Sequence, residues 1–150
     1  MDKSLFQQKR KSHIEKGEIY FWTATINGWK HLLKEDAMKM EIIQSLQWLK
    51  QSELINVYAY VIMPNYLHFV LKVIGLNDKE SPQVSLLNFT AHNFKKIRSA
   101  SDSNILKDFA VNTKEKAYDF WQRDSLVRPL FSCPSRNVSF FYLHHFMKVA

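Results

Sequence analysis

His68 lies in a stretch of alternating residues, Tyr66 to Ile74 (YLHFVLKVI), that is typical of a β-strand. Successive side chains of a strand point to opposite faces, so His68 shares a face with Tyr66 and lies opposite a continuous apolar stripe. An imidazole in such a position can bind a metal ion or transfer a proton. A single strand histidine is more often a packed or surface residue, so the strand alone does not decide between these roles.

A surplus of positive charge favours a polyanionic partner. The 21 Lys and Arg residues exceed the 14 Asp and Glu residues and give a net charge of +7. Basic surfaces attract nucleic acids by releasing counterions, although a solvated surface or a helix C-terminus can also carry such charges. The cations that we expect to contact nucleic acid lie in an N-terminal arm, at the end of a helix-like segment and near the C-terminal third: Arg10, Lys11, Lys95, Lys96, Arg98 and Arg123.

Length and composition exclude several classes of protein. At 150 residues the chain has the usual size of one domain, and we expect a single domain over 1–150 with a basic arm at 1–16. A Walker motif and a Rossmann fingerprint are both absent. One cysteine, Cys133, rules out an internal disulfide framework, and the longest apolar run, Val57 to Met63, is far shorter than a membrane span. Without a signal-peptide core near the start, we expect a cytoplasmic protein with no membrane contact.

The first half of the chain predicts a strand, a helix and a hairpin. Glu18 to Ile26 is rich in aromatic and β-branched residues and predicts a strand that ends at the Asn27-Gly28 turn. A helical apolar period follows over about Lys34 to Glu53. Ile55 to Met63 and Tyr66 to Ile74 predict two strands joined by Pro64-Asn65. The apolar stripe of the helix consists of Met38, Ile42, Leu46 and Leu49.

The second half predicts a further helix and a short strand. Ser81-Pro82 is typical of an N-cap and first helical position, and Ser99 to Ser103 predicts a loop. Leu126 to Phe131 suits an edge strand because of Pro129, and a last helix follows from Ser135. The buried face of the second helix is expected to contain Leu87, Ala91, Phe94 and Ile97.

The resulting order, β-α-β-β-α-(β)-α, predicts a ferredoxin-like α+β fold. Its antiparallel sheet would carry helices on one face, with an added C-terminal helix. That plan hosts enzymes, RNA-binding proteins and metal-binding proteins, so the fold does not determine the function.

The stretch Tyr58 to Leu71 (YAYVIMPNYLHFVL) resembles the signature of the single-tyrosine HUH transposases, which include the REP-associated tyrosine transposases of bacteria. In that family a strand, a Met-Pro-Asn turn and a His-hydrophobe-His triplet follow one another. Glu18 to Trp29, Phe120-Trp121-Gln122 and Tyr142-Leu143-His144 resemble other family segments in the same order. The resemblance covers about Glu18 to His144.

The resemblance implies a reaction and its participants. Tyr142 would be the nucleophile that attacks a DNA phosphodiester and forms a 5′-phosphotyrosine. A strand histidine pair would hold a divalent ion, Mg²⁺ or Mn²⁺, and His68 corresponds to the second histidine of that pair. The implied partner is a single-stranded DNA hairpin. The implied assembly is a homodimer that exchanges its tyrosine-bearing helices.

The sequence departs from the family at the expected metal ligands. Tyr66 occupies the position of the first histidine, and Phe146 replaces a polar residue one helical turn after Tyr142. A neutral phenol is a poor ligand for a hard divalent ion. His145, three residues after Tyr142, lies on the same helical face and is a possible substitute. We therefore expect impaired cleavage and a metal site that is weakened or lost.

Two alternatives stay open. One is a non-catalytic DNA-binding module that is decaying or co-opted from a transposase. The other is a ferredoxin-like RNA-binding protein that stacks bases on aromatic side chains of its sheet. Phe21, Tyr58 and Tyr60 are the candidates for that stacking, although a core beneath helices could equally take them.

Overall fold

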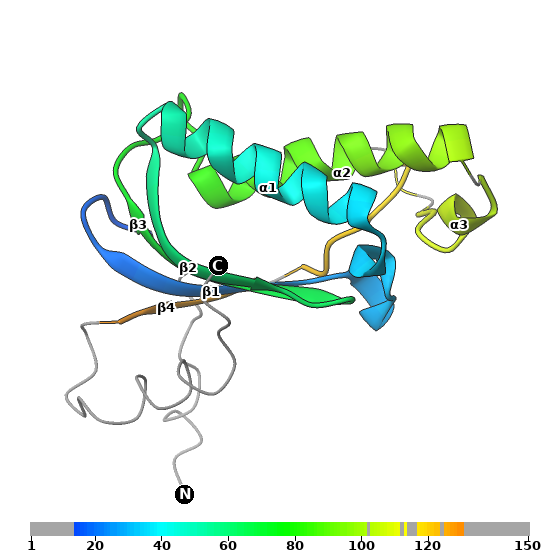
Figure 1. Cartoon of the computed structure of the whole chain (residues 1–150), viewed down its shortest axis with the longest axis horizontal. Helices are drawn as coiled ribbons and strands as arrows, with labels where there is room; N and C mark the ends of the chain where they lie inside the picture. Colours follow the sequence, from blue (N-terminus) through cyan, green and yellow to red (C-terminus); the bar gives the residue numbers. More distant parts are fainter. Residues whose placement is uncertain (1–13, 102, 112, 114–116, 124, 131–150) are drawn as a thin grey trace, which may run out of the picture.

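A computed structural model describes residues 14–101, 103–111, 113, 117–123 and 125–130. Two long helices and a four-stranded sheet make up most of this part of the chain (Figure 1). The elements are β1 (Ile19–Thr25), α1 (Asp36–Gln51), β2 (Ile55–Ile62), β3 (Tyr66–Val73), α2 (Pro82–Ser101), α3 (Ser103–Lys107) and β4 (Leu126–Pro129), with short 3-10 turns at Asn27–Trp29 and Leu32–Lys34.

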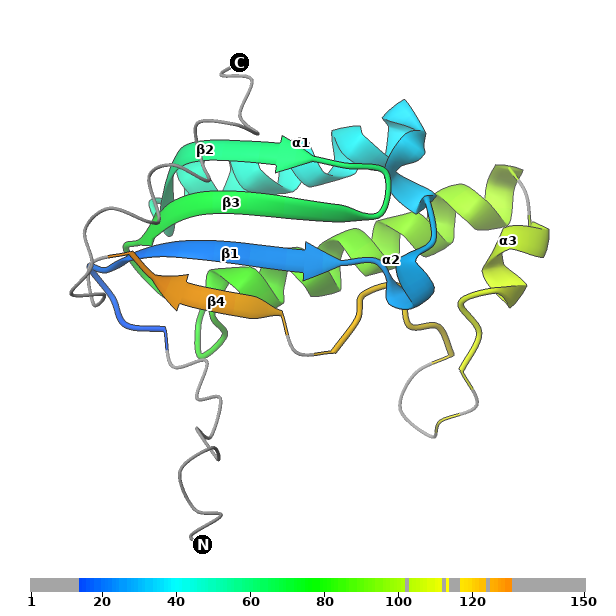
Figure 2. The same cartoon turned by 90° about the horizontal axis from the view of Figure 1, so that it is seen from below.

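The sheet has the strand order β2-β3-β1-β4, and each neighbouring pair is antiparallel. Figure 2 views it from the side opposite the helices, with α1 and α2 behind the strands. This arrangement of strands and helices is the predicted ferredoxin-like plan. The prediction of an α+β fold is therefore confirmed, while the expected C-terminal helix lies outside the described residues.

Alternation along the strands separates a core face from a second face. Every other residue of β1 is buried, and β3 buries Leu67, Phe69 and Leu71 beneath the helices. Helix α1 closes this core with the apolar stripe predicted from its period, and all of its members are buried: Met38, Ile42, Leu46 and Leu49. The polar residues between the buried ones of β3 are left on the opposite face of the sheet.

Helix α2 presents a slightly different stripe from the predicted one. Phe94 is fully buried as expected, but Leu87, Ala91 and Ile97 are only partly buried at the edge of the core. A row that includes Leu86 and Thr90 takes the central position. The apolar pattern of the sequence missed this row because threonine is a polar residue type. Thr90 can nevertheless be buried, since its hydroxyl donates to the Leu86 carbonyl oxygen at 2.8 Å and is satisfied within the core.

The predicted loop over Ser99 to Ser103 is wrong in part, because α2 continues to Ser101 and α3 begins at Ser103. Serine usually competes with the helix for backbone hydrogen bonds. Here the hydroxyls of Ser99 and Ser101 donate to the carbonyl oxygens of Lys95 and Ile97, one turn earlier, and leave the helix intact.

Turn and cap signals set the ends of the elements. Ser81 precedes Pro82, and its hydroxyl oxygen accepts from the Val84 backbone N–H at 3.4 Å, as an N-cap does. Pro64-Asn65 joins β2 to β3, and β4 is an edge strand with Pro129 at its end. Gly28 has φ 67°, a left-handed conformation that suits glycine in the turn after β1.

Within the described residues no helix is both long and apolar enough to cross a membrane.

Candidate functional site

His68 lies on the sheet face opposite α1 and α2, which we call the His68 face. It pairs with Thr23 on β1 and with Val61 on β2. Tyr66 is two residues earlier on β3, and its ring centroid is 4.9 Å from that of His68. The Phe21 ring is also stacked on that of His68, with the two centroids 5.1 Å apart. The strand alternation thus places the histidine and the tyrosine together, as their spacing predicted.

The surroundings of His68 favour a neutral imidazole. Its Nδ1 is 2.7 Å from Thr23 Oγ1, and desolvation by burial lowers its pKa below the ordinary 6.5. When Nδ1 carries the proton, it donates to Thr23 and leaves the Nε2 lone pair available. His68 can then accept a proton or coordinate a cation through Nε2.

The described residues of the His68 face do not make a fitting site for a hard divalent ion. His68 and Tyr66 supply one imidazole and one phenol, whereas Mg²⁺ prefers near-octahedral oxygen ligands. No group of three or more His, Cys, Asp or Glu side chains that could hold a metal occurs among the described residues. His145, the predicted substitute ligand, lies outside those residues.

Several predicted functional residues fall in the parts of the chain that the structure does not describe. Tyr142 and His145 belong to the C-terminal segment, and Arg10 and Lys11 belong to the N-terminal arm. Their roles stay predictions.

The predicted basic cluster at the end of α2 divides into exposed and buried members. Lys95 and Lys96 are exposed, and the Lys95 ammonium lies 5.3 Å from the centroid of the Tyr118 ring. Arg98 is 4% exposed, and its Nη2 donates to Glu35 Oε1 at 2.6 Å. The Arg98 guanidinium therefore ties α2 to the residue before α1 and is not presented to a ligand.

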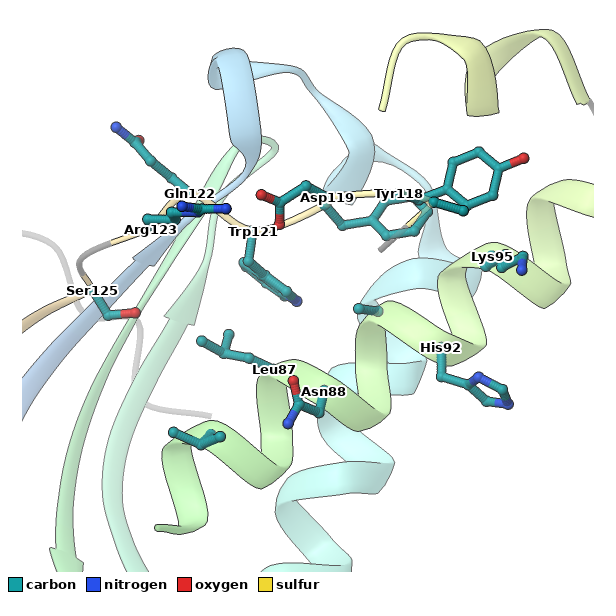
Figure 3. Close-up of a pocket in the computed structure, with 14 residues that line it drawn as sticks. Leu87, Asn88, His92, Lys95, Tyr118, Asp119, Trp121, Gln122, Arg123 and Ser125 are labelled. Carbon is teal, nitrogen blue, oxygen red and sulfur yellow. The ribbon is translucent and has the colours of Figure 1, made fainter. Parts of the chain in front are cut away.

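Lys95 and Arg123 line one pocket, which we call the α2 groove. Its cavity measures about 400 Å³ and lies between α2, from Val84 to Lys95, and residues 117–123 and Ser125 (Figure 3). Arg123 and Lys95 lie toward opposite ends of the labelled lining. The sequence indicated both cations but not their common pocket, since tertiary packing alone brings residues 95 and 123 to the same cavity.

Sequence reasoning missed two other features of these sites. Thr23 and His68 are 45 residues apart and meet through the β1–β3 register. The Trp121 Nε1–H donates to Thr90 Oγ1 at 3.1 Å and so joins the part of the pocket lining that contains Trp121 to α2. The only sequence signal for Thr23 was its alternation with the apolar residues of β1.

Comparison with known proteins gives a structural relationship. No family model and no curated protein matches the sequence. The structure resembles that of a REP-associated tyrosine transposase bound to a REP hairpin, with a TM-score of 0.52 and 18% identity over 89% of this chain. The chain spans 64% of that protein's length. The resemblance expected from the hairpin motif is thus confirmed at the level of the fold.

A candidate transposase from Deinococcus radiodurans R1 also matches, with a TM-score of 0.45 and 19% identity. That match covers 81% of this chain and 84% of the other. A TM-score of this size does not establish a shared fold.

Proposed function

We infer that the chain is a DNA-binding transposase homologue whose partner is a single-stranded DNA hairpin. The observation that carries this proposal is the fold shared with a tyrosine transposase whose structure holds a REP hairpin. The Met-Pro-Asn turn supports it, because this turn leads directly into β3, the strand that carries His68. The net charge of +7 suits a polyanionic partner.

The reaction that we propose for this chain, by analogy with the family, is a transesterification in which Tyr142 is the nucleophile. Its phenolate oxygen would attack a DNA phosphorus atom, and the bond from phosphorus to the leaving 3′ oxygen would break. The products would be a 5′-phosphotyrosine and a strand whose 3′ oxygen takes up a proton and becomes a free hydroxyl. The phosphotyrosine would conserve the bond for rejoining.

Tyr66 supports a reaction that is impaired in this chain. A divalent ion at the histidine pair would supply charge neutralisation at the phosphate. The donors described on the His68 face do not fit such an ion, because Tyr66 stands where the first histidine of the pair would be. No step of the reaction is therefore assigned to a metal.

The same observation favours a second candidate, a DNA-binding module without catalytic activity. Binding through surface cations does not require the missing imidazole, so it would persist in a decaying or co-opted homologue. The RNA-binding alternative receives less support. Tyr60 is partly buried and its ring centroid lies 6.5 Å from that of Phe69 in the core, while Phe21 is stacked on His68. Of the three predicted stacking residues, only Tyr58 is largely exposed, at 57%.

Covalent capture of a labelled DNA hairpin tests the reaction. Wild-type protein with Mg²⁺ should capture little of a single-stranded hairpin substrate, and Tyr142→Phe should capture none. Tyr66→His should capture more than wild type if the weak point is the ligand position. The assay is denaturing electrophoresis, which separates the covalent protein–DNA adduct from free oligonucleotide.

Robust capture by the wild type that depends on Tyr142 would contradict the impaired reaction and establish an active transposase. An adduct that survives in Tyr142→Phe would contradict the assignment of the nucleophile. Hairpin binding without capture by any variant would favour the non-catalytic module.

A further inference from the structure

We propose that Lys72 and Arg128 contact phosphates of the DNA backbone and extend the His68 face into a phosphate-binding surface. Neither residue belongs to the cations that the sequence led us to expect at nucleic acid. The proposal rests on the proposed DNA-binding function and names residues that would hold the strand beside His68.

The register of the sheet places both cations on the same face as His68. Lys72 is four residues after His68 on β3, so strand alternation points the two side chains to the same side. Arg128 lies on β4 directly opposite Phe21 of β1, and the Phe21 ring is stacked on that of His68. Directly paired residues share a face, so Arg128 also points away from the helices. Figure 2 views this face, with β3, β1 and β4 side by side.

The strands that form this face carry positive charge and no carboxylate. The four strands of the described sheet contain no Asp or Glu, and their Lys and Arg residues are Lys72 and Arg128. Lys72 is partly buried and Arg128 is exposed, and neither has an ion pair within the described residues. A cation without an ion pair, on strands without carboxylates, is available to a phosphate.

Three acidic residues lie within two positions of a strand end. Glu18 and Glu53 precede β1 and β2, are exposed, and form no ion pair with Lys72 or Arg128. Asp124 lies outside the described residues, and it precedes β4, whereas Arg128 is the third residue of that strand. The strand residues of the His68 face therefore carry two positive charges and no negative one.

Both cations lie on the side of His68 that is away from the Met-Pro-Asn turn. Phe21, the partner of Arg128, pairs on its other side with Val70, two residues beyond His68 on β3. Lys72 follows two residues later, about 13 Å from His68 along the strand at about 3.3 Å per residue. A DNA strand with one phosphate at His68 would therefore meet the two cations in succession as it leaves the site in this direction.

Substitutions that remove charge but keep a polar side chain test the two contacts. Lys72→Gln with Arg128→Gln, the face pair, removes both cations, and Lys34→Gln with Lys50→Gln, the control pair, removes two exposed lysines elsewhere. Fluorescence anisotropy with a labelled DNA hairpin that has a single-stranded flank gives the affinity over a range of salt. The face pair should lose about tenfold in affinity and lower the slope of log K against log salt by about 1.4–1.8, at about 0.7–0.9 per phosphate contact. The control pair should lose less than about twofold and keep its slope.

Two further variants separate loss of charge from damage to the sheet. Lys72→Arg with Arg128→Lys keeps both positive charges and should keep the wild-type slope and an affinity within about twofold of wild type. Arg128→Gln alone, at an exposed position of an edge strand, should lower the slope by about 0.7–0.9 without disturbing the partly buried Lys72. Equal losses in the charge-preserving variant and the face pair would overturn the phosphate contacts.

The remaining outcomes distinguish this surface from the proposed function. Equal losses in the face pair and the control pair would overturn the surface while leaving the proposed function intact. Failure of the wild type to bind any DNA would overturn both. Tighter binding of an RNA hairpin of the same sequence, with that preference lost in the face pair, would overturn the assignment of the surface to DNA.

Discussion

Because His68 is partly buried, its protonation state should affect the free energy of unfolding. Its folded pKa lies below the ordinary 6.5 because desolvation disfavours the imidazolium. The unfolded chain thus binds a proton more readily, so the contribution of the neutral imidazole is complete above about pH 6.5 and is lost as pH falls through the folded pKa. The free energy of unfolding should decrease over that range more steeply in wild type than in His68→Gln.

Urea unfolding at several pH values, followed by circular dichroism, measures this difference. The His68→Gln protein retains a polar side chain opposite Thr23 and controls for the other histidines. Parallel pH profiles for the two proteins would contradict this prediction, because they would show that the pKa of His68 is the same in the folded and the unfolded chain.

We expect the residue at position 66 to decide whether the His68 face can bind a metal. Tyr66→His would place two imidazoles at alternate positions of β3, on the same face and beside each other. We expect the melting temperature of this variant to rise on addition of Mn²⁺, whereas that of wild type should change little. A metal-dependent rise of equal size in His68→Ala/Tyr66→His would contradict a shared site, because only one of the two imidazoles remains there.

The sequence predicted this neighbourhood only in part. The alternation in Tyr66 to Ile74 was enough to put His68 beside Tyr66 and opposite the core. It could not identify Thr23 as the hydrogen-bond partner, since the pairing of β1 with β3 is non-local. Local spacing also cannot show burial of a charge, and for this reason Arg98 was grouped with its exposed neighbours.

Arg98 and Glu35 connect the two long helices at the scale of elements. The Arg98 side chain is nearly buried, while that of Glu35 is half exposed. Arg98→Ala should lower the free energy of unfolding by about 1.5–3 kcal/mol, because a hydrogen bond to a charged group and the packing of the arginine stem are lost. It should leave DNA affinity unchanged.

Lys96→Ala is the matched control, two residues away on the exposed side of α2. We expect its stability to stay within about 0.5 kcal/mol of wild type and its DNA affinity to fall. Urea unfolding and anisotropy measure the two quantities. A loss of DNA affinity in Arg98→Ala as large as in Lys96→Ala would return Arg98 to the DNA-binding set.

Periodicity and punctuation predicted most elements because their signals are local. The apolar stripe of α1, the Pro64-Asn65 turn and the Ser81-Pro82 cap each depend on a few adjacent residues. The central stripe of α2 was displaced because Thr90 is buried through a hydrogen bond with Trp121, 31 residues later. Tertiary partners of that kind override residue type and cannot be seen in a short window.

The assembly of the whole molecule gives a further prediction. The family resemblance implies exchange of tyrosine-bearing helices, and the last helix predicted from the sequence carries apolar residues around much of its circumference. One small domain can cover only one stripe of such a helix, so we expect a homodimer. Light scattering at micromolar concentrations and above measures the mass, and a value near the 17.8 kDa of one chain would contradict the prediction.

The central claim, that this fold binds single-stranded hairpin DNA, is tested most directly by comparing two ligands. The dissociation constant for a strand that folds into a hairpin with a single-stranded flank is measured beside that for a blunt duplex of the same stem sequence, each with and without Mg²⁺. We expect the hairpin strand to bind at least about tenfold more tightly, a difference of about 1.4 kcal/mol. We expect little change on removing Mg²⁺, since binding relies on surface cations. Equal affinity for the two ligands, or no measurable binding to either, would contradict the claim.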